Sequence, residues 1–225
     1  MNAAPALLRL LQLTSPALPV GAYSYSEGLE TLVQAGTIAT ANALADWLTQ
    51  ELRYGAIRLE AAIVTRIYQA AQTQDFEQLN RWNQWISALR ETTELRDQSW
   101  QMGRSLTRLL SDLEPDLKPM IAACHPPHHF ATAFALAAWF WQIDLQTTLL
   151  GYFHSWASNL VNAGIRLIPL GQTQGQKLLL SLYPQLEQTA TEVLTLNDDE
   201  LWNCSWGLTI ASMNHETLYS RLFRS

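Results

Sequence analysis

The densest group of reactive side chains is "CHPPHH" at residues 124–129, which places one thiol and three imidazoles within six positions. Thiolates and imidazoles bind transition metals well, so this stretch is a candidate metal site. A closed site needs about four converging ligands, normally from two separated pairs. Pro126 and Pro127 hold the backbone extended, and the adjacent His128 and His129 then point apart. The pattern is more typical of a polar loop that leads into a helix.

A second stretch with possible chemistry is "GQTQGQK" at residues 171–177, which resembles a phosphate-binding loop. That loop follows the pattern G-x-x-x-x-G-K-[ST], in which the hydroxyl after the lysine holds Mg²⁺. Here the spacing from Gly171 to Gly175 is one residue short, Gln176 precedes Lys177, and leucine follows the lysine. No strand pattern precedes the stretch to support such a loop. We interpret it as a turn between helices.

The remaining histidines and acids do not form a catalytic pattern. We expect His154 and His215 to be satisfied within helices, and Asp198 and Asp199 to cap a helix. Neither H-E-x-x-H nor G-x-S-x-G occurs, and no nucleophile is paired with a base. We therefore predict a protein that is not an enzyme, with no catalytic residues, no cofactor and no metal of its own.

Composition limits the classes of partner. The chain has 225 residues and a net charge of −6, which argues against binding to nucleic acid because phosphates require a basic surface. No apolar run reaches the roughly 18 residues of a membrane span, so we expect no membrane association. The N-terminal "ALLRLLQL" is interrupted by Arg9 and followed by prolines rather than by a cleavage site.

Cysteine and tryptophan usage add two further expectations. Cys124 and Cys204 lack C-x-x-C spacing, which is typical of a reducing compartment, and we expect a cytoplasmic protein. Only 15% of residues are charged, yet there are 9 tryptophans. This balance favours an oligomer or a stable partner that covers apolar surface.

The elements that must position these residues are helices. Neither Asn-Gly nor Asp-Gly occurs, and long alternating patterns are absent, so strands are not expected. Within residues 41–71, apolar side chains recur at steps of mostly four and form a stripe on one helical face: Leu44, Leu48, Leu52, Leu59, Ile63 and Ile67. Asp75 and Gln78 have capping-box spacing before a helix over residues 76–90.

The second half of the chain continues the helical pattern. After a periodic run over residues 94–113, four prolines interrupt residues 114–130. Helices are then predicted around 130–142 and 145–167, and the first is apolar nearly all round, which is typical of a helix at the centre of a core. A further helix or helix pair is expected in residues 175–194. We predict an all-α protein, a single-domain helical bundle of about eight to ten helices over residues 1–225.

Residues 14–36, "TSPALPVGAYSYSEGLETLVQAG", have a pattern typical of a turn followed by a short helix. Gly21 permits a sharp turn after the prolines, and Ser24 and Glu27 have capping-box spacing into a helix that ends near Gly36. Tyr23 and Tyr25 lie at the entrance to that helix. Either tyrosine could pack onto the core or remain free for an interface.

The last residues of the chain, "HETLYSRLFRS" at 215–225, include large apolar and aromatic side chains. Chain termini are more often poorly ordered. If the segment is helical, Tyr219 and Phe223 form an i,i+4 aromatic pair. Arg221 and Arg224 can make bidentate contacts with carboxylates. Two interpretations stay open: the tail folds back onto its own domain, or it becomes ordered on a partner protein.

Four stretches in this order resemble the UreF family of urease accessory proteins, and together they extend from about Leu7 to Ser225. They are "SPALPVGAYSYSEGLE", "TTELRDQSWQMGRSL", "RLIPLGQTQGQKLLLSL" and "SMNHETLYSRLFRS". The resemblance implies an all-α homodimer without catalytic residues that helps to assemble the nickel centre of urease. It implies that the chain binds UreD (UreH), recruits the GTPase UreG, acts with them on apo-urease and couples GTP hydrolysis to nickel insertion.

The resemblance also implies which residues bind partners. The family's tail corresponds to residues 215–225, for which a contact with UreD is implied, and its N-terminal aromatic corresponds to Tyr23. Its basic residue before "PL" corresponds to Arg166, implied with Tyr23 in UreG recruitment or in the nickel route. The full set of implied partner-binding residues is Tyr23, Ser24, Arg166, His215, Glu216, Tyr219, Arg221, Leu222, Phe223 and Arg224.

One alternative function remains beside this resemblance. The chain could be a nickel-binding metallochaperone that uses His125, His128 and His129, in which case it would bind nickel stoichiometrically. The scaffold interpretation instead predicts that loss of residues 215–225 leaves a folded, dimeric protein that no longer binds UreD.

Overall fold

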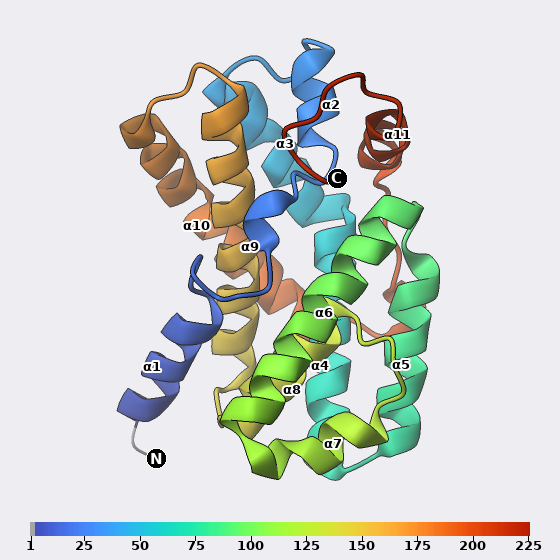
Figure 1. Cartoon of the computed structure of the whole chain (residues 1–225). Helices are drawn as coiled ribbons and strands as arrows, with labels where there is room; N and C mark the ends of the chain where they lie inside the picture. Colours follow the sequence, from blue (N-terminus) through green and yellow to red (C-terminus); the bar gives the residue numbers. More distant parts are fainter. Residues whose placement is uncertain (1–2) are drawn as a thin grey trace.

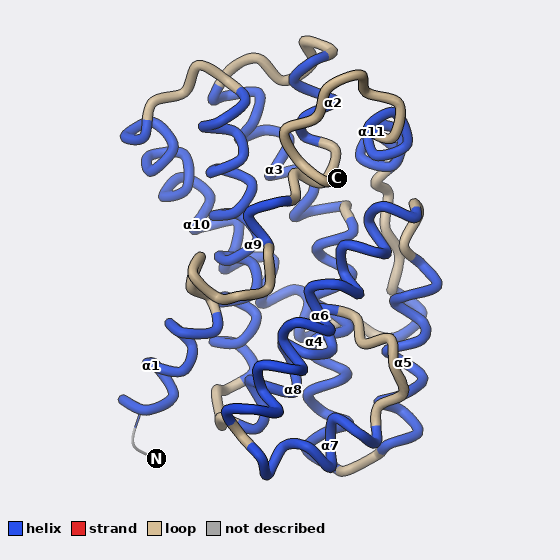
Figure 2. The backbone as a smooth tube through the Cα atoms, in the orientation of Figure 1, coloured by secondary structure: helices blue, strands red, loops and turns tan. Residues whose placement is uncertain are grey.

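The computed structural model describes residues 3–225, and this part of the chain contains eleven α-helices and three short 3-10 helices without any strand (Figures 1 and 2). The all-α prediction is confirmed, and the helix count is slightly above the expected range. The α-helices are α1 (Ala3–Leu13), α2 (Leu29–Gln34), α3 (Ala41–Tyr54), α4 (Ala56–Thr73), α5 (Phe76–Leu89), α6 (Thr93–Leu113), α7 (Lys118–Ala123), α8 (Phe130–Phe140), α9 (Leu145–Leu167), α10 (Gln172–Thr195) and α11 (Trp206–His215). The 3-10 helices are η1 (Ala22–Ser24), η2 (Pro115–Leu117) and η3 (Asp198–Glu200).

Helices α4 and α8 form the centre of the core. Helix α4 packs against α3, α5, α8, α9 and α10, and α8 also packs against α6 and α9. Every α8 residue from Ala131 to Ala138 is buried, in agreement with its prediction as the central helix. Helix α6 approaches the backbone just before α8 closely at Gly103, because a Cβ there would lie 2.1 Å from the carbonyl oxygen of His128.

The apolar stripe of residues 41–71 forms two helices, and all six of its leucines and isoleucines are buried. Helix α3 ends and α4 begins at Gly55, which has extended backbone. A Cβ at Gly55 would lie 2.0 Å from the Glu51 carboxylate, so the tight junction requires glycine. The periodicity therefore predicted the buried face correctly and gave no sign of the break.

Two other predictions on helices can be compared directly with the structure. Asp75 accepts a hydrogen bond from the Gln78 N–H at 3.0 Å, so the predicted start of α5 is confirmed. Helix α10 is one continuous helix with Pro184 inside it, which resolves the choice between a helix and a helix pair.

The two ends of the described chain lie in different parts of the bundle. Helix α1 packs against α8, whereas α11 packs against α2 at the other end of the molecule in Figure 1. The C-terminal residues after α11 run back beside α2. None of the helices within residues 3–225 has the length and apolar character needed to cross a bilayer.

Candidate partner-binding surface

The N-terminal turn separates its two tyrosines. Gly21 has a φ of +78°, which reverses the chain into η1, and Tyr23 in η1 is 70% exposed. Tyr25 is buried, and its carbonyl oxygen accepts a hydrogen bond from Asn159 Nδ2 of α9 at 3.3 Å. Of the two roles left open for these residues, Tyr25 therefore packs onto the core, and Tyr23 is free for an interface.

The predicted capping box of Ser24 and Glu27 is wrong. Glu27 and Gly28 both have positive φ, and α2 begins only at Leu29. This backbone turns the Glu27 carboxylate inward, where it accepts from Trp156 Nε1 at 3.1 Å and from Gln98 Nε2 at 3.3 Å. The short helix itself ends at Gln34, close to the predicted end at Gly36.

The C-terminal tail, residues 216–225, is not helical. Helix α11 ends at His215, and the N–H groups of Leu222 and Phe223 donate to the two Glu30 carboxylate oxygens at 2.7 and 2.9 Å. These N–H groups are therefore not available for bonds within a helix. The aromatic pair that depended on a helix does not form, because Tyr219 is fully exposed while Phe223 is 4% exposed.

The tail and the N-terminal turn meet at Arg166, near the end of α9. Arg166 Nη1 donates to the Tyr23 carbonyl oxygen at 3.3 Å, and its guanidinium lies 4.4 Å from the centre of the Phe223 ring. A guanidinium over an aromatic face is an attractive arrangement. The Arg224 N–H donates to the Ser24 carbonyl oxygen at 2.8 Å. Residues from three distant parts of the sequence thus form one surface, which we call the composite surface.

Two more contacts join the tail to the turn. The Ser225 main-chain oxygen accepts from both the N–H and the hydroxyl of Ser26, each at 2.7 Å. Burial raises the pKa of the Tyr25 hydroxyl, and the Arg224 guanidinium beside it acts in the opposite direction. The tail therefore packs on the turn along its last residues.

The implied partner-binding residues differ in accessibility. His215 and Phe223 are buried within the chain, and Ser24 is half-buried. The exposed members are Tyr23, Arg166, Glu216, Tyr219, Arg221, Leu222 and Arg224. A partner that binds the chain in this conformation can contact the exposed set directly, whereas His215 and Phe223 are covered by the rest of the chain.

Two acidic residues hold the base of the tail, and the sequence patterns did not identify either one. His215 lies between them, with Nδ1 2.9 Å from Glu94 Oε2 and Nε2 3.4 Å from Glu30 Oε2. Arg221 donates to Glu94 Oε1 at 3.2 Å. Both acids stand inside stretches that resemble the family, but nothing in their spacing pairs them with the C-terminus.

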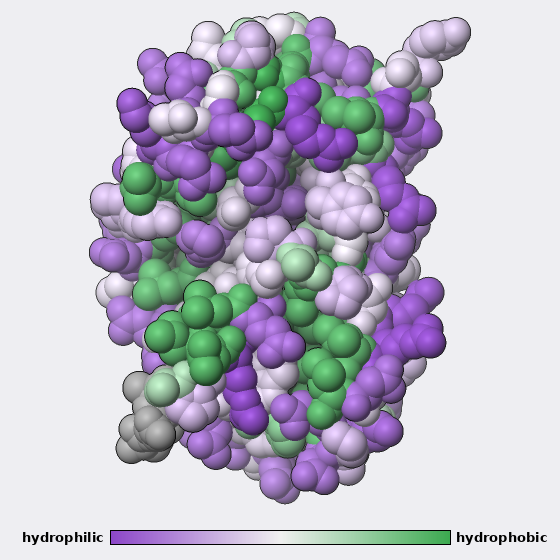
Figure 3. All heavy atoms as spheres, turned by 60° about the vertical axis from the view of Figure 1, so that its left-hand side comes forward, coloured by the Kyte–Doolittle hydropathy of each residue, from purple (hydrophilic) through white to green (hydrophobic). Residues whose placement is uncertain are grey.

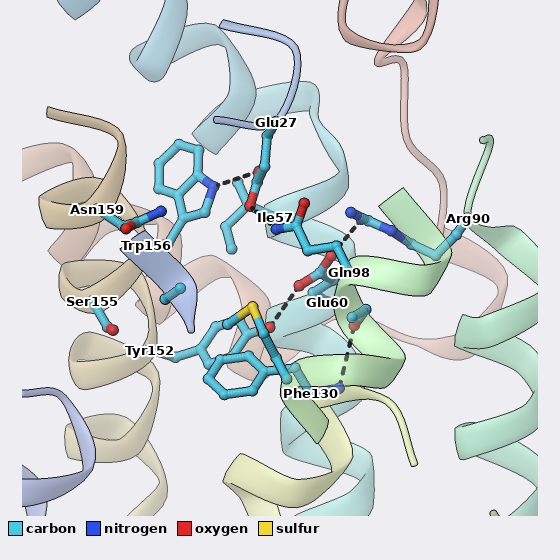
Figure 4. A pocket seen from close by; sticks show the side chains of 13 residues that line it. Glu27, Ile57, Glu60, Arg90, Gln98, Phe130, Tyr152, Ser155, Trp156 and Asn159 are labelled. Carbon is cyan, nitrogen blue, oxygen red and sulfur yellow. Dashed lines mark hydrogen bonds and ion pairs between the residues drawn. The ribbon is translucent and has the colours of Figure 1, made fainter. Parts of the chain in front are cut away.

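A buried polar network extends from Glu27 of the N-terminal turn to Glu60 and Arg90 (Figure 4). The Glu60 carboxylate binds Arg90 Nη1 and accepts the Tyr152 hydroxyl at 2.6 Å. Burial raises the pKa of Glu27, and the nearby Glu60 carboxylate raises it further. Burial opposes the charge on Arg90, but Glu60, Glu27, Glu91 and Tyr152 together outweigh it and raise the pKa of Arg90. The network ties the N-terminal turn to α4, α6 and α9.

Two small adjacent cavities accompany this network. One cavity, of about 50 Å³, is lined by network residues, and the other, of about 80 Å³, lies under residues 13–23. They share Ala22, Phe130, Ser155 and Asn159 in their walls. Cavities of this size hold a few waters beside polar groups. The arrangement is suited to supporting the turn.

The histidine loop does not assemble a metal site. Asn83 Nδ2 donates to the carbonyl oxygens of His125 and Pro127, and His129 Nδ1 accepts the Ala131 N–H at 3.2 Å. His128 Nε2 lies 2.8 Å from the Cys124 carbonyl oxygen. Throughout the described chain, no three His, Cys, Asp or Glu side chains come close enough to hold a metal ion. The prediction of a polar loop that leads into a helix is confirmed.

The thiol and the buried imidazole of this loop are also unsuited to metal binding. Burial raises the pKa of the Cys124 thiol to about 12, so the thiolate form is disfavoured. His129 is fully buried, and its Nδ1 is already used at the start of α8. The nickel-binding alternative has no support in this geometry.

The chain is thus an all-α protein with exposed tyrosines and arginines on the composite surface. Tyrosine and arginine are enriched at protein–protein interfaces. The sequence model of the UreF family matches residues 38–183. The chain is similar to urease accessory protein UreF of Nostoc sp. (strain PCC 7120), with 59% identity over 97% of this chain and 95% of that protein. UreF of Synechocystis sp. (strain PCC 6803) is 51% identical over the full length of both chains, and UreF of Janthinobacterium sp. (strain Marseille) is 42% identical over 99% of each. The chain belongs to the UreF family of urease accessory proteins.

Proposed function

We propose that this chain is a non-catalytic scaffold that bridges UreD (UreH) and the GTPase UreG and couples GTP hydrolysis to nickel insertion into apo-urease. The single observation that carries the proposal is the meeting of the tail and the N-terminal turn at Arg166. The family resemblance implies a contact with UreD for the tail, and a role in UreG recruitment or in the nickel route for Tyr23 and Arg166. The contact between the tail and the turn gives a physical route by which one bound partner can influence the other.

The chemistry of the composite surface supports binding to proteins. Tyr219 is fully exposed and Leu222 is more than half exposed, although both belong to a tail with many backbone contacts. Ordered, exposed aromatic and arginine side chains contribute strongly to protein interfaces because little conformational entropy is lost on binding. We assign the tail to UreD, and Tyr23 with Arg166 to UreG.

We further propose that the chain acts as a cytoplasmic homodimer. Apolar side chains gather over α1 at the lower left of Figure 3, where Leu7, Leu8 and Leu11 are each more than half exposed. An apolar helical face of this kind is a candidate for burial between subunits. This surface is separate from the composite surface, so a dimer formed through α1 leaves the tail accessible.

Co-expression with UreD, UreG and apo-urease tests the scaffold, with sizing of the complexes in the presence and absence of a GTP analogue. We expect Tyr219→Ala to lose UreD, and its matched control Leu180→Ala, which truncates an exposed leucine of α10, to retain it. Arg166→Ala is expected to lose UreG selectively, while Arg104→Ala on α6 binds normally. Retention of both partners by both surface variants would contradict the proposal.

A further inference from the structure

Within residues 3–225, the hydrogen bonds of the Glu30 carboxylate all come from the C-terminal part of the chain. Its carboxylate receives the Leu222 N–H on Oε1 and the Phe223 N–H on Oε2, at 2.7 and 2.9 Å. His215 Nε2 lies 3.4 Å from Oε2. Glu30 itself is 2% exposed. A buried carboxylate is stable only when its oxygens are well paired, so the carboxylate and the tail depend on each other.

The position of Glu30 suits this contact. It lies in the first turn of α2, where the partial positive charge of the helix favours a carboxylate. Glu94, on α6, binds His215 and Arg221 from the other side. His215, at the base of the tail, thus lies between Glu30 and Glu94. Further along the tail, the N–H groups of Leu222 and Phe223 bind Glu30 alone.

We infer that Glu30 is the docking residue of the tail, a positioning residue that fixes residues 216–225 against the N-terminal turn. Because Phe223 docks beside it, the ring comes under Arg166 and the Leu222 side chain faces outward. The consequence for UreD binding rests on the function proposed above. The docking role itself concerns only contacts within this chain.

Glutamate is specifically suited to this position. Both carboxylate oxygens are acceptors, and each takes one of two successive N–H groups. A glutamine of the same shape has one acceptor, and its amide N–H₂ would face one of the tail N–H groups. Glu30→Gln should therefore undock the tail while changing the volume of the site very little.

Hydrogen exchange on the full-length chain tests the inference. We expect the amides of Leu222 and Phe223 to be protected in the unmodified protein, and Glu30→Gln to speed their exchange about tenfold or more. Exchange in α4 and α8 should stay unchanged. The matched control is Glu77→Gln, an exposed glutamate in the first turn of α5, and it should leave tail exchange unaltered.

The outcomes separate this inference from the proposed function. Unchanged tail exchange in Glu30→Gln overturns the docking role, as does faster exchange throughout α4 and α8. Faster tail exchange together with full UreD co-purification supports the docking role and overturns the assignment of UreD to the tail. If Glu30→Gln does not fold, Leu222→Pro removes one donor from the tail side and leaves α2 intact. The amide of Phe223 should then lose its protection, and retained protection overturns the inference.

Discussion

The central helices and the C-terminal part of the chain are held in the molecule by different interactions. Helix α8 is buried from Ala131 to Ala138, and all but one of these residues are apolar. Residues 196–225, the C-terminal segment, contact the bundle largely through polar pairs. These pairs are Arg66–Asp198, Glu91–Asn203, Glu51–Ser205, Thr92–Ser212, Glu94–His215 and Glu30 with the amides of Leu222 and Phe223.

This difference has a consequence for stability and function. Apolar burial of a central helix is coupled to the whole core, so its loss unfolds the protein. A segment held by separate polar contacts can open locally while the core stays intact. The C-terminal segment is therefore the part of the molecule in which binding can be changed without loss of the fold, and four substitutions test this contrast.

The largest effect is expected from Phe134→Ala in α8. Phe134 is fully buried, and its ring lies 5.1 Å from that of Tyr152. The substitution should lower the free energy of unfolding by about 3–5 kcal/mol and the melting temperature by about 10 °C. Thermal unfolding followed by circular dichroism measures this effect. A loss below about 1 kcal/mol would show that α8 is not at the structural centre.

A smaller, pH-dependent effect is expected from Glu51→Gln, at the contact of the C-terminal segment with α3. Burial raises the pKa of Glu51 from 4.5 to about 7, against the opposing hydrogen bond from Ser205. Because the folded state binds this proton more tightly, ionisation of Glu51 destabilises the fold as the pH rises from 4.5 to about 7. The glutamine variant avoids that cost, which is about 3 kcal/mol.

Thermal unfolding at two pH values tests this expectation. Glu51→Gln should be more stable than the unmodified protein at pH 8 and equal to it near pH 4. Glutamine still accepts the Ser205 hydroxyl, so the contact itself is kept. A loss of stability at pH 8, or an equal gain at both pH values, would contradict the account.

Phe223→Ala truncates a buried phenylalanine of the C-terminal segment, as Phe134→Ala does in α8. Phe223 is also buried, but its cost is limited because the tail can undock from the bundle instead of leaving a cavity. We expect a loss of about 1–2 kcal/mol, measured by urea unfolding. A loss as large as that of Phe134→Ala would show that the tail and the core unfold as one unit.

The smallest effect on stability is expected from Tyr23→Ala. The Tyr23 side chain is largely exposed, so the free energy of unfolding should change by less than about 0.5 kcal/mol. Under the proposed function, UreG should nevertheless be lost from the complex. Tyr25→Ala is the matched control, and it should destabilise the fold because that ring is buried. If Tyr23→Ala and Tyr25→Ala destabilised the fold equally, the assignment of Tyr23 to the proposed interface would be wrong.

The same contrast explains what the sequence could predict about the fold. The apolar pattern predicted α8 and α9 because burial of a regular face is a local property of the sequence. The start of α5 at Asp75 was predictable in the same local way. The break at Gly55 escaped prediction because the leucine stripe continues in phase across it.

The candidate surface could be predicted only in part. The resemblance to a family supplied residues from both segments that the structure brings into contact. It could not supply Glu30 or Glu94, because they meet His215 across 185 and 121 positions of sequence. The capping box of Ser24 and Glu27 failed because the backbone at Glu27 and Gly28 is left-handed, which spacing alone does not reveal.

The central claim is that the tail and the N-terminal turn form one partner-binding surface. Hydrogen exchange of the full-length chain, alone and in complex with UreD and UreG, tests it most directly. The account predicts added protection in both residues 216–225 and residues 21–27, with little change in α5 and α7. Added protection confined to α5 and α7, with both segments exchanging as in the free protein, would contradict it.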